Sequence, residues 1–177
     1  MPTEPIWQMT AVAISSAVRS GEISAVEVTE AILDRIETVD PQLNAFCISM
    51  ADSARATALS IDEQVSRGED PGRLAGVPIS IKDNLYIEGE RTTFGSKWFE
   101  DNVTSEDTPL VARLKEAGAV LIGRTNSPEF GWKGATDNLV FGTTRNPWNT
   151  DRTPGGSSGG ASAAVAAGMG PVGIGTD

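Results

Sequence analysis

The chain contains no histidine and a single cysteine, Cys47, among its 177 residues. Without histidine, a Ser-His-Asp triad, a Cys-His dyad and a histidine-containing zinc site cannot be built from these residues. One cysteine also excludes a cysteine-rich metal site and an internal disulfide. A lone thiol is typical of a reducing compartment.

Basic residues and long apolar runs are scarce as well. The 14 Lys and Arg residues face 24 Asp and Glu residues, which gives a net charge of -10. This balance argues against direct binding to nucleic acid or to an anionic membrane surface, because both select for clustered Lys and Arg. No apolar stretch approaches the roughly 20 residues that span a bilayer. Residues 1–8 lack the basic and apolar regions of a secretory leader, so we expect a cytoplasmic protein.

The first part of the chain has the periodicity of amphipathic helices. Helical spacing covers residues 10–19 and 51–67, and a further helix begins at Ser24. Glu27 stands three residues after Ser24, which is the spacing of a capping box. Pro41 is expected to end that helix. The three helices are interpreted as cover for a hydrophobic core.

The second part of the chain alternates apolar strands with helices. Short apolar runs at 74–81, 119–123 and 171–175 indicate buried strands, and residues 108–118 and 159–169 are helix-like. Apolar strands joined by helices favour a parallel sheet covered by helices. The stretch 130–153 has little periodicity and is expected to be a long loop.

A glycine-serine run, Thr-Pro-Gly-Gly-Ser-Ser-Gly-Gly at 153–160, precedes the last predicted helix. A phosphate loop needs a Lys followed by Ser or Thr after its last glycine, and this run has neither that pair nor a preceding strand. Anion binding at the start of the helix stays open. The run also matches G-x-S-x-G, centred on Ser157 and on Ser158, but a nucleophile elbow needs a histidine base.

Lys82 can supply the base that histidine supplies elsewhere. It follows the apolar strand, at the end where open α/β sheets place their sites. Burial lowers the pKa of a lysine and makes the neutral amine available. Asp83 could hold Lys82 protonated, but neighbouring residues of a strand point to opposite faces. A serine hydroxyl can bridge the amine to a second hydroxyl, so a Ser-Ser-Lys relay needs no histidine. The alternative is a solvated lysine at a strand end.

Several motifs resemble those of the amidase signature family. Residues 76–84, Gly-Val-Pro-Ile-Ser-Ile-Lys-Asp-Asn, resemble the first catalytic motif of this family. Residues 123–130, Gly-Arg-Thr-Asn-Ser-Pro-Glu-Phe, are similar to its Gly-Lys-Thr-Asn-x-x-Glu-Phe segment. Residues 146–149, 154–160 and 173–177 match further motifs in the same order, so the resemblance covers nearly the whole chain.

This resemblance implies an α/β fold, with an α/β/α sandwich around a mixed, largely parallel sheet. Residues 1–177 would be the N-terminal part of one amidase domain, with a helical segment at 1–70 and the start of the catalytic core at 71–177. The family acts on carboxamides through an acyl-enzyme, and no cofactor or metal is implied. The expected partner is a small-molecule amide substrate, and a homodimer of the full-length protein is left open.

The resemblance also assigns roles to individual residues. Lys82 would be the terminal base and Ser157 the relay serine, which in this family is preceded or flanked by a cis peptide bond. The supporting residues would be Gly156, Ser158, Thr176 and Asp177.

The family pattern continues after Gly-Thr-Asp into an apolar residue, two glycines and the nucleophilic serine. Because the sequence ends at Asp177, we expect these residues alone to be inactive. Two alternatives stay open. One is the glutamine-hydrolysing subunit of the amidotransferase that serves misacylated tRNA, and the other is a non-catalytic truncated fragment. The sequence does not identify the amide that is the substrate.

Overall fold

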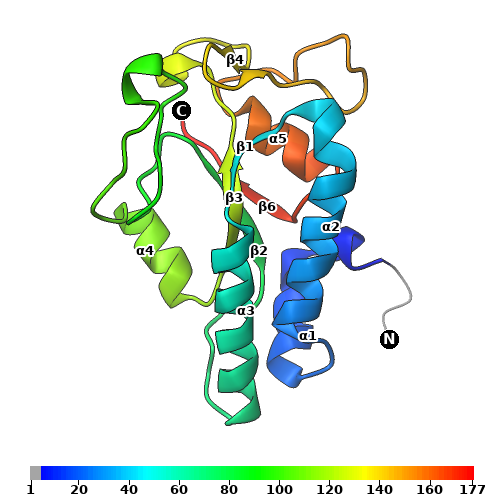
Figure 1. Ribbon diagram of the computed structural model, residues 1–177. Helices are drawn as coiled ribbons and strands as arrows, with labels where there is room; N and C mark the ends of the chain where they lie inside the picture. Colours follow the sequence, from blue (N-terminus) through cyan, green and yellow to red (C-terminus); the bar gives the residue numbers. More distant parts are fainter. Residues whose placement is uncertain (1–4) are drawn as a thin grey trace.

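A four-stranded sheet forms the centre of the computed structural model, which describes residues 5–177 (Figure 1). Residues 1–4 lie outside the described residues. They belong to the predicted helical segment 1–70 and to the N-terminus that is expected to lack a leader. The strands, in the order in which they pair, are β1 (Phe46–Ser49), β3 (Val120–Thr125), β2 (Pro78–Lys82) and β6 (Val172–Ile174). β2 is parallel to β3 and β6, whereas β1 is antiparallel to β3. The predicted mixed, largely parallel sheet is confirmed.

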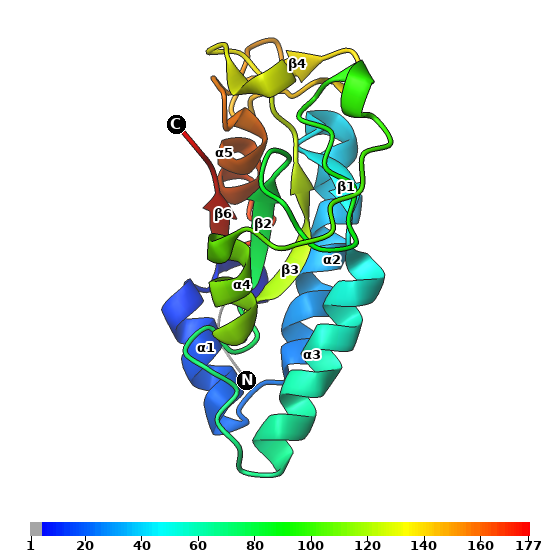
Figure 2. The ribbon, with the colours of Figure 1, turned by 90° about the vertical axis from the view of Figure 1, so that its left-hand side faces the viewer.

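Helices lie on both sides of this sheet. They are α1 (Ala11–Ser20), α2 (Ala25–Leu43), α3 (Ala51–Ser66), α4 (Pro109–Glu116) and α5 (Gly159–Ala166). Short 3-10 helices cover Ile6–Gln8, Lys97–Phe99 and Glu129–Gly131. α4 lies on one side of the sheet and α2 and α5 on the other (Figures 1 and 2). Within residues 5–177, no helix combines the length and apolar character that a membrane crossing requires.

The predicted start of α2 is confirmed, but its predicted end at Pro41 is wrong. The capping box forms as expected, with Ser24 and Glu27 each accepting from the backbone N–H of the other. The helix then continues through Pro41. Beyond the proline, Asn44 takes a left-handed conformation and donates its backbone N–H to the carbonyl of Asp40 at 2.8 Å. A proline close to a helix end removes only one backbone bond, and this cap closes the last turn.

Two parts of the sheet prediction need correction. β1 was missed, because its four residues form a short edge strand with no alternating pattern. β2 begins at Pro78 instead of residue 74, since Gly76 adopts a φ of 70° and Val77 donates to the Leu74 carbonyl at 2.9 Å in a turn. Within the predicted loop 130–153, a small sheet pairs β4 (Asp137–Asn138) with β5 (Gly142–Thr143).

The glycines of the run 153–160 allow close backbone contact. A Cβ at Gly160 would lie 2.5 Å from the backbone N and O of Asn126, which follows β3. A Cβ at Gly159 would overlap the Thr136 hydroxyl. The start of α5 therefore packs directly against the segment that leaves β3. This contact brings the glycine-serine run to the carboxyl ends of the parallel strands, where open α/β folds place their sites.

Candidate active site

Lys82 and Ser157 meet at this edge of the sheet. Lys82 is the last residue of β2 and is fully buried, and Ser157 stands two residues before α5. The Lys82 Nζ lies 2.7 Å from the Ser157 Oγ. Gly131, from the loop after β3, closes one side of the pair. A Cβ at Gly131 would lie 3.6 Å from the Ser157 Oγ and 3.8 Å from the Lys82 Nζ, so the Gly131 backbone lies directly beside both groups.

Thr176, which follows β6, borders the same lysine. The Lys82 Nζ lies 2.9 Å from the Thr176 Oγ1 and 3.4 Å from its backbone carbonyl oxygen. The Ser158 hydroxyl accepts from the Thr176 N–H at 3.2 Å and donates to the Thr176 carbonyl at 3.1 Å. Asn84 donates from its Nδ2 to the Thr176 Oγ1 at 2.9 Å. The structure thus places Ser158 and Thr176 beside the Lys82–Ser157 pair and adds Asn84, which was not predicted from the sequence.

The remaining residues singled out in the sequence lie at the same place. The peptide bond between Gly156 and Ser157 is cis, as the resemblance implies. Burial lowers the pKa of the Lys82 amine from its ordinary value of 10.5, whereas the negative charge of Asp177 raises it. Burial is the larger effect, so the pKa of Lys82 lies below 10.5 and the amine loses its proton more readily than a lysine in water.

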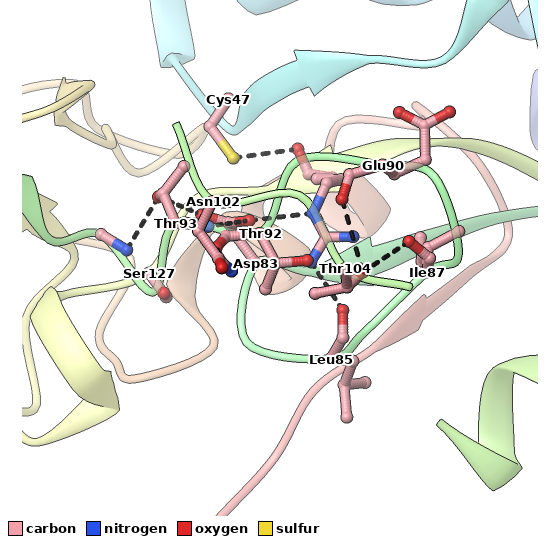
Figure 3. A network of polar contacts seen from close by, with 12 residues as sticks. Cys47, Asp83, Leu85, Ile87, Glu90, Thr92, Thr93, Asn102, Thr104 and Ser127 are labelled. Carbon is pink, nitrogen blue, oxygen red and sulfur yellow. Dashed lines mark hydrogen bonds and ion pairs between the residues drawn. The ribbon is translucent and has the colours of Figure 1, made fainter. Parts of the chain in front are cut away.

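Asp83 does not contact the amine of Lys82. Its carboxylate accepts from the Arg124 Nε at 2.9 Å, and both side chains are buried, with 1% and 0% exposed. The Arg124 Nη2 also donates to the Leu85 carbonyl at 2.6 Å, and the Thr93 N–H donates to Asp83 (Figure 3). Ile81, the neighbour of Lys82 in β2, pairs in register with Arg124. Strand alternation therefore directs the ion pair to the face opposite the Lys82 side chain.

We expect Arg124→Met to lower the free energy of unfolding of the full-length protein by about 3–5 kcal/mol, because it leaves the Asp83 carboxylate buried without a cation. The urea midpoint measures this change. Arg145→Met is the matched control, since Arg145 is exposed and its side chain makes one long contact with the Thr150 carbonyl at 3.5 Å. Equal losses in the free energy of unfolding for the two variants would show that the buried ion pair stabilises the fold no more than the exposed Arg145 contact does.

An aromatic cluster adjoins the Lys82–Ser157 pair through the Phe130–Gly131 step. The Phe94 and Phe130 ring centroids lie 6.2 Å apart, and Phe99 packs edge-on against both rings at 5.4 and 5.9 Å. Phe94 and Phe130 both adopt positive φ angles, at 54° and 51°, and the Phe130 N–H donates to the Phe94 carbonyl at 2.8 Å. Phe130 is nevertheless 55% exposed. Phe130 thus exposes an aromatic ring one residue along the chain from Gly131, which borders the site.

The sequence contained weak signals for the residues that were missed. Asn84 stands inside the motif 76–84, two residues after Lys82, but its type alone does not indicate a contact with Thr176. Arg124 occupies the basic position of the segment 123–130, where a charge inside a buried strand could have pointed to a buried acidic partner.

Comparison with known proteins agrees with the motifs. The family model described as Amidase matches residues 27–177. An indoleacetamide hydrolase from Bradyrhizobium diazoefficiens is 48% identical over 176 residues, which is 99% of this chain and 34% of that protein. A glutamyl-tRNA(Gln) amidotransferase subunit from Carboxydothermus hydrogenoformans is 46% identical over 172 residues, which is 97% of this chain and 36% of that protein.

The fold gives the same result. The crystal structure of a bacterial aryl acylamidase that belongs to the amidase signature enzymes superposes with a TM-score of 0.92 and 39% identity, covering 96% of this chain and 36% of that one. The chain therefore spans about a third of the length of the relatives it matches.

Proposed function

The chain belongs to the amidase signature family, and we propose that it forms the N-terminal part of an amidase that cleaves a carboxamide through a covalent acyl-enzyme. The observation that carries this proposal is the 2.7 Å contact between a fully buried lysine and a serine in a chain without histidine. We further propose that residues 1–70 are the N-terminal segment of this domain, whose described part is helical apart from β1, and that residues 71–177 are the start of its catalytic core.

In the proposed mechanism Lys82 is the base and Ser157 the proton relay. The attacking hydroxyl belongs to a serine outside these 177 residues. As it bonds to the amide carbon, its proton passes to the Ser157 Oγ, while the Ser157 proton passes to the neutral Lys82 amine. The lysine ammonium then returns a proton through Ser157 to the leaving amine as the C–N bond breaks. Water then attacks the acyl-enzyme, with its proton taken up through Ser157 by Lys82, and the carboxylic acid is released.

We propose supporting roles for the residues around this pair. Thr176 accepts hydrogen bonds from the Lys82 amine, and Ser158 holds the Thr176 backbone through its hydroxyl. Gly156 precedes the relay serine. Asp177 opposes the effect of burial on the pKa of Lys82.

The substrate we propose is an amide with an aromatic group. The Phe130 ring is half-exposed, belongs to the aromatic cluster and is adjacent to Gly131 at the site. Two related proteins are an indoleacetamide hydrolase and an aryl acylamidase, whose names both refer to aromatic compounds. An aryl group that stacks on Phe130 would gain about 0.5–1.5 kcal/mol beyond its burial.

We expect Phe130→Ala in the full-length protein to raise KM for an aryl amide by about 10-fold, and to change KM for a small aliphatic amide much less. Trp148→Ala is the matched control, because Trp148 is 85% exposed, lies in the loop after β5 and takes part in none of the ring contacts of the aromatic cluster. Steady-state kinetics with both amides measure the difference. A uniform rise in KM for the two amides would contradict aromatic selectivity at this position.

A second candidate is the glutamine-hydrolysing subunit of a tRNA-dependent amidotransferase, which the 46% identity to the protein from Carboxydothermus hydrogenoformans favours. A panel of aryl, aliphatic and amino-acid amides, with glutamine included, separates the two. Turnover of aryl amides by the full-length protein alone supports the amidase. Glutamine turnover that appears only when a co-purifying partner protein is present supports the amidotransferase. A full-length protein that is inactive on every amide overturns both.

A further inference from the structure

The Lys82 amine needs a fixed orientation if it is to act as the base, a requirement that rests on the proposed function. A neutral amine carries two N–H donors and one lone pair. To accept the Ser157 proton, the lone pair must face the Ser157 Oγ at 2.7 Å. Both N–H groups must then be directed elsewhere. Thr176 offers two acceptors to them, its Oγ1 at 2.9 Å and its backbone oxygen at 3.4 Å.

The two acceptors of Thr176 are held by different partners. Its backbone carbonyl is bound by the Ser158 hydroxyl at 3.1 Å. Its Oγ1 sits on a rotatable side chain and accepts from the Asn84 Nδ2 at 2.9 Å. Without this donor, the hydroxyl could turn away from the lysine or donate its own proton to the amine and occupy the lone pair. Asn84 is therefore the group that fixes the Oγ1 position.

Asn84 is itself fixed relative to Lys82. Its backbone N–H donates to the Lys82 carbonyl at 2.8 Å in the turn that ends β2. Its side-chain Oδ1 is buried and has no hydrogen-bond partner among residues 5–177. The side chain is thus held by its bond to the Thr176 hydroxyl, and it links the end of β2 to the segment after β6.

We propose that Asn84 is a positioning residue, which acts through the Thr176 hydroxyl to aim the Lys82 lone pair at Ser157. Asn84 does not touch the reacting atoms in this proposal. Its neutral amide matters as well as its shape. The Asn84 Nδ2 and the Lys82 Nζ each lie 2.9 Å from the same oxygen, so they are no more than about 6 Å apart. A negative charge at position 84 would stabilise the ammonium and remove the base.

Several charged groups on other elements lie near Lys82 and contribute to the pH profile of the parent protein. Asp177 follows β6 and raises the pKa of the amine. Asp83 is paired with Arg124 of β3 on the opposite face of the strand. In the loop that passes Gly156, Lys133 is paired with Asp137 at 2.8 Å. None of these groups changes in variants of Asn84, so a shift in the pH profile reports on position 84.

The test uses Asn84→Leu and Asn84→Asp in the full-length protein with one amide substrate. We expect Asn84→Leu to lower kcat by about 10- to 100-fold with little change in KM, because the base is misaligned while substrate binding is kept. We expect Asn84→Asp to move the acid limb of the pH profile of kcat/KM to higher pH by about one unit. This shift reports only how close position 84 is to the amine, whereas a loss in kcat at constant KM in Asn84→Leu reports the positioning role.

Two further variants complete the test. In a Thr176→Val background, Asn84→Leu should have no additional effect on kcat, because its route through the hydroxyl is already absent. Asn102→Leu is the matched control, since Asn102 donates to the Thr92 carbonyl at 3.0 Å and belongs to the polar network drawn in Figure 3. This control should leave kcat and the acid limb unchanged.

The outcomes separate this proposal from the proposed function. If Lys82→Met keeps full activity, the relay itself is wrong. If Lys82→Met is inactive but Asn84→Leu keeps the kcat of the parent protein, the relay stands and the role of Asn84 is overturned. Additive effects of Asn84→Leu and Thr176→Val would also overturn it. Should Asn84→Leu fail to fold, Asn84→Ala replaces it in the same kcat and KM measurements, alone and in the Thr176→Val background.

Discussion

Lys82→Met in the full-length protein is expected to lower kcat for amide hydrolysis by about 10⁴-fold or more, because the variant lacks the only buried amine at the site among residues 5–177. Lys82→Arg should be equally inactive at every pH, since a guanidinium does not lose its proton in proteins. In the parent protein, kcat/KM should rise with pH as Lys82 loses its proton. Steady-state rates across the pH range measure these effects.

The stability of the Lys82 variant provides an independent check. Burial lowers the pKa of Lys82 in the folded protein below 10.5, so the unfolded chain binds this proton more tightly. The proton therefore costs stability below the folded-state pKa, and the cost disappears as the pH rises to about 10.5. Lys82→Met removes the cost, so the variant should be at least as stable as the parent at neutral pH.

Lys115→Met is the matched control for both measurements. Lys115 pairs with Asp107 at 2.8 Å, and its side chain is 41% exposed. We expect its kcat to match that of the parent protein within about twofold and its stability to change by no more than about 1 kcal/mol, the usual contribution of a partly exposed ion pair. An active Lys82→Met variant would rule out the lysine as the base.

Ser157→Ala is expected to lower kcat by about 10³-fold, because the attacking hydroxyl loses its path to the lysine. Ser158→Ala should cost less, since the Ser158 hydroxyl binds the Thr176 backbone and not the Lys82 amine. Rates of the two single variants on one amide establish the order.

The control for the serines lies in the helix that follows them. Ser162 is exposed, and its hydroxyl donates to the Ser158 carbonyl at 3.1 Å, so Ser162→Ala removes a hydroxyl without reaching the site. Its kcat should match that of the parent. A double variant of Lys82→Met and Ser157→Ala should be no slower than Lys82→Met alone, because residues that act as one unit are not additive. If the loss of kcat in the double variant equals the product of the two single losses, the two residues act separately.

Much of the fold could be predicted because local rules agree with the tertiary structure. The capping box at Ser24, the apolar runs of β2 and β3 and the small-residue helix after the glycine-serine run are visible in short windows of sequence. β1 was missed since its four residues have no alternating pattern and depend on pairing with β3. The helix end at Pro41 was wrong because the cap at Asn44 was not anticipated.

By itself, the sequence determined which chemistry is available. The absence of histidine excludes the common triads, and the motif order places Lys82 and Ser157 in the amidase signature pattern. The sequence also pairs Lys82 with Ser157, but the tertiary structure alone decided that Asn84 and Thr176 join this pair, because the ends of β2 and β6 meet only in the folded sheet. The tertiary structure also paired Asp83 with Arg124 on the far face of β2. Contacts between such distant segments depend on strand register and backbone approach, which no short window of sequence specifies.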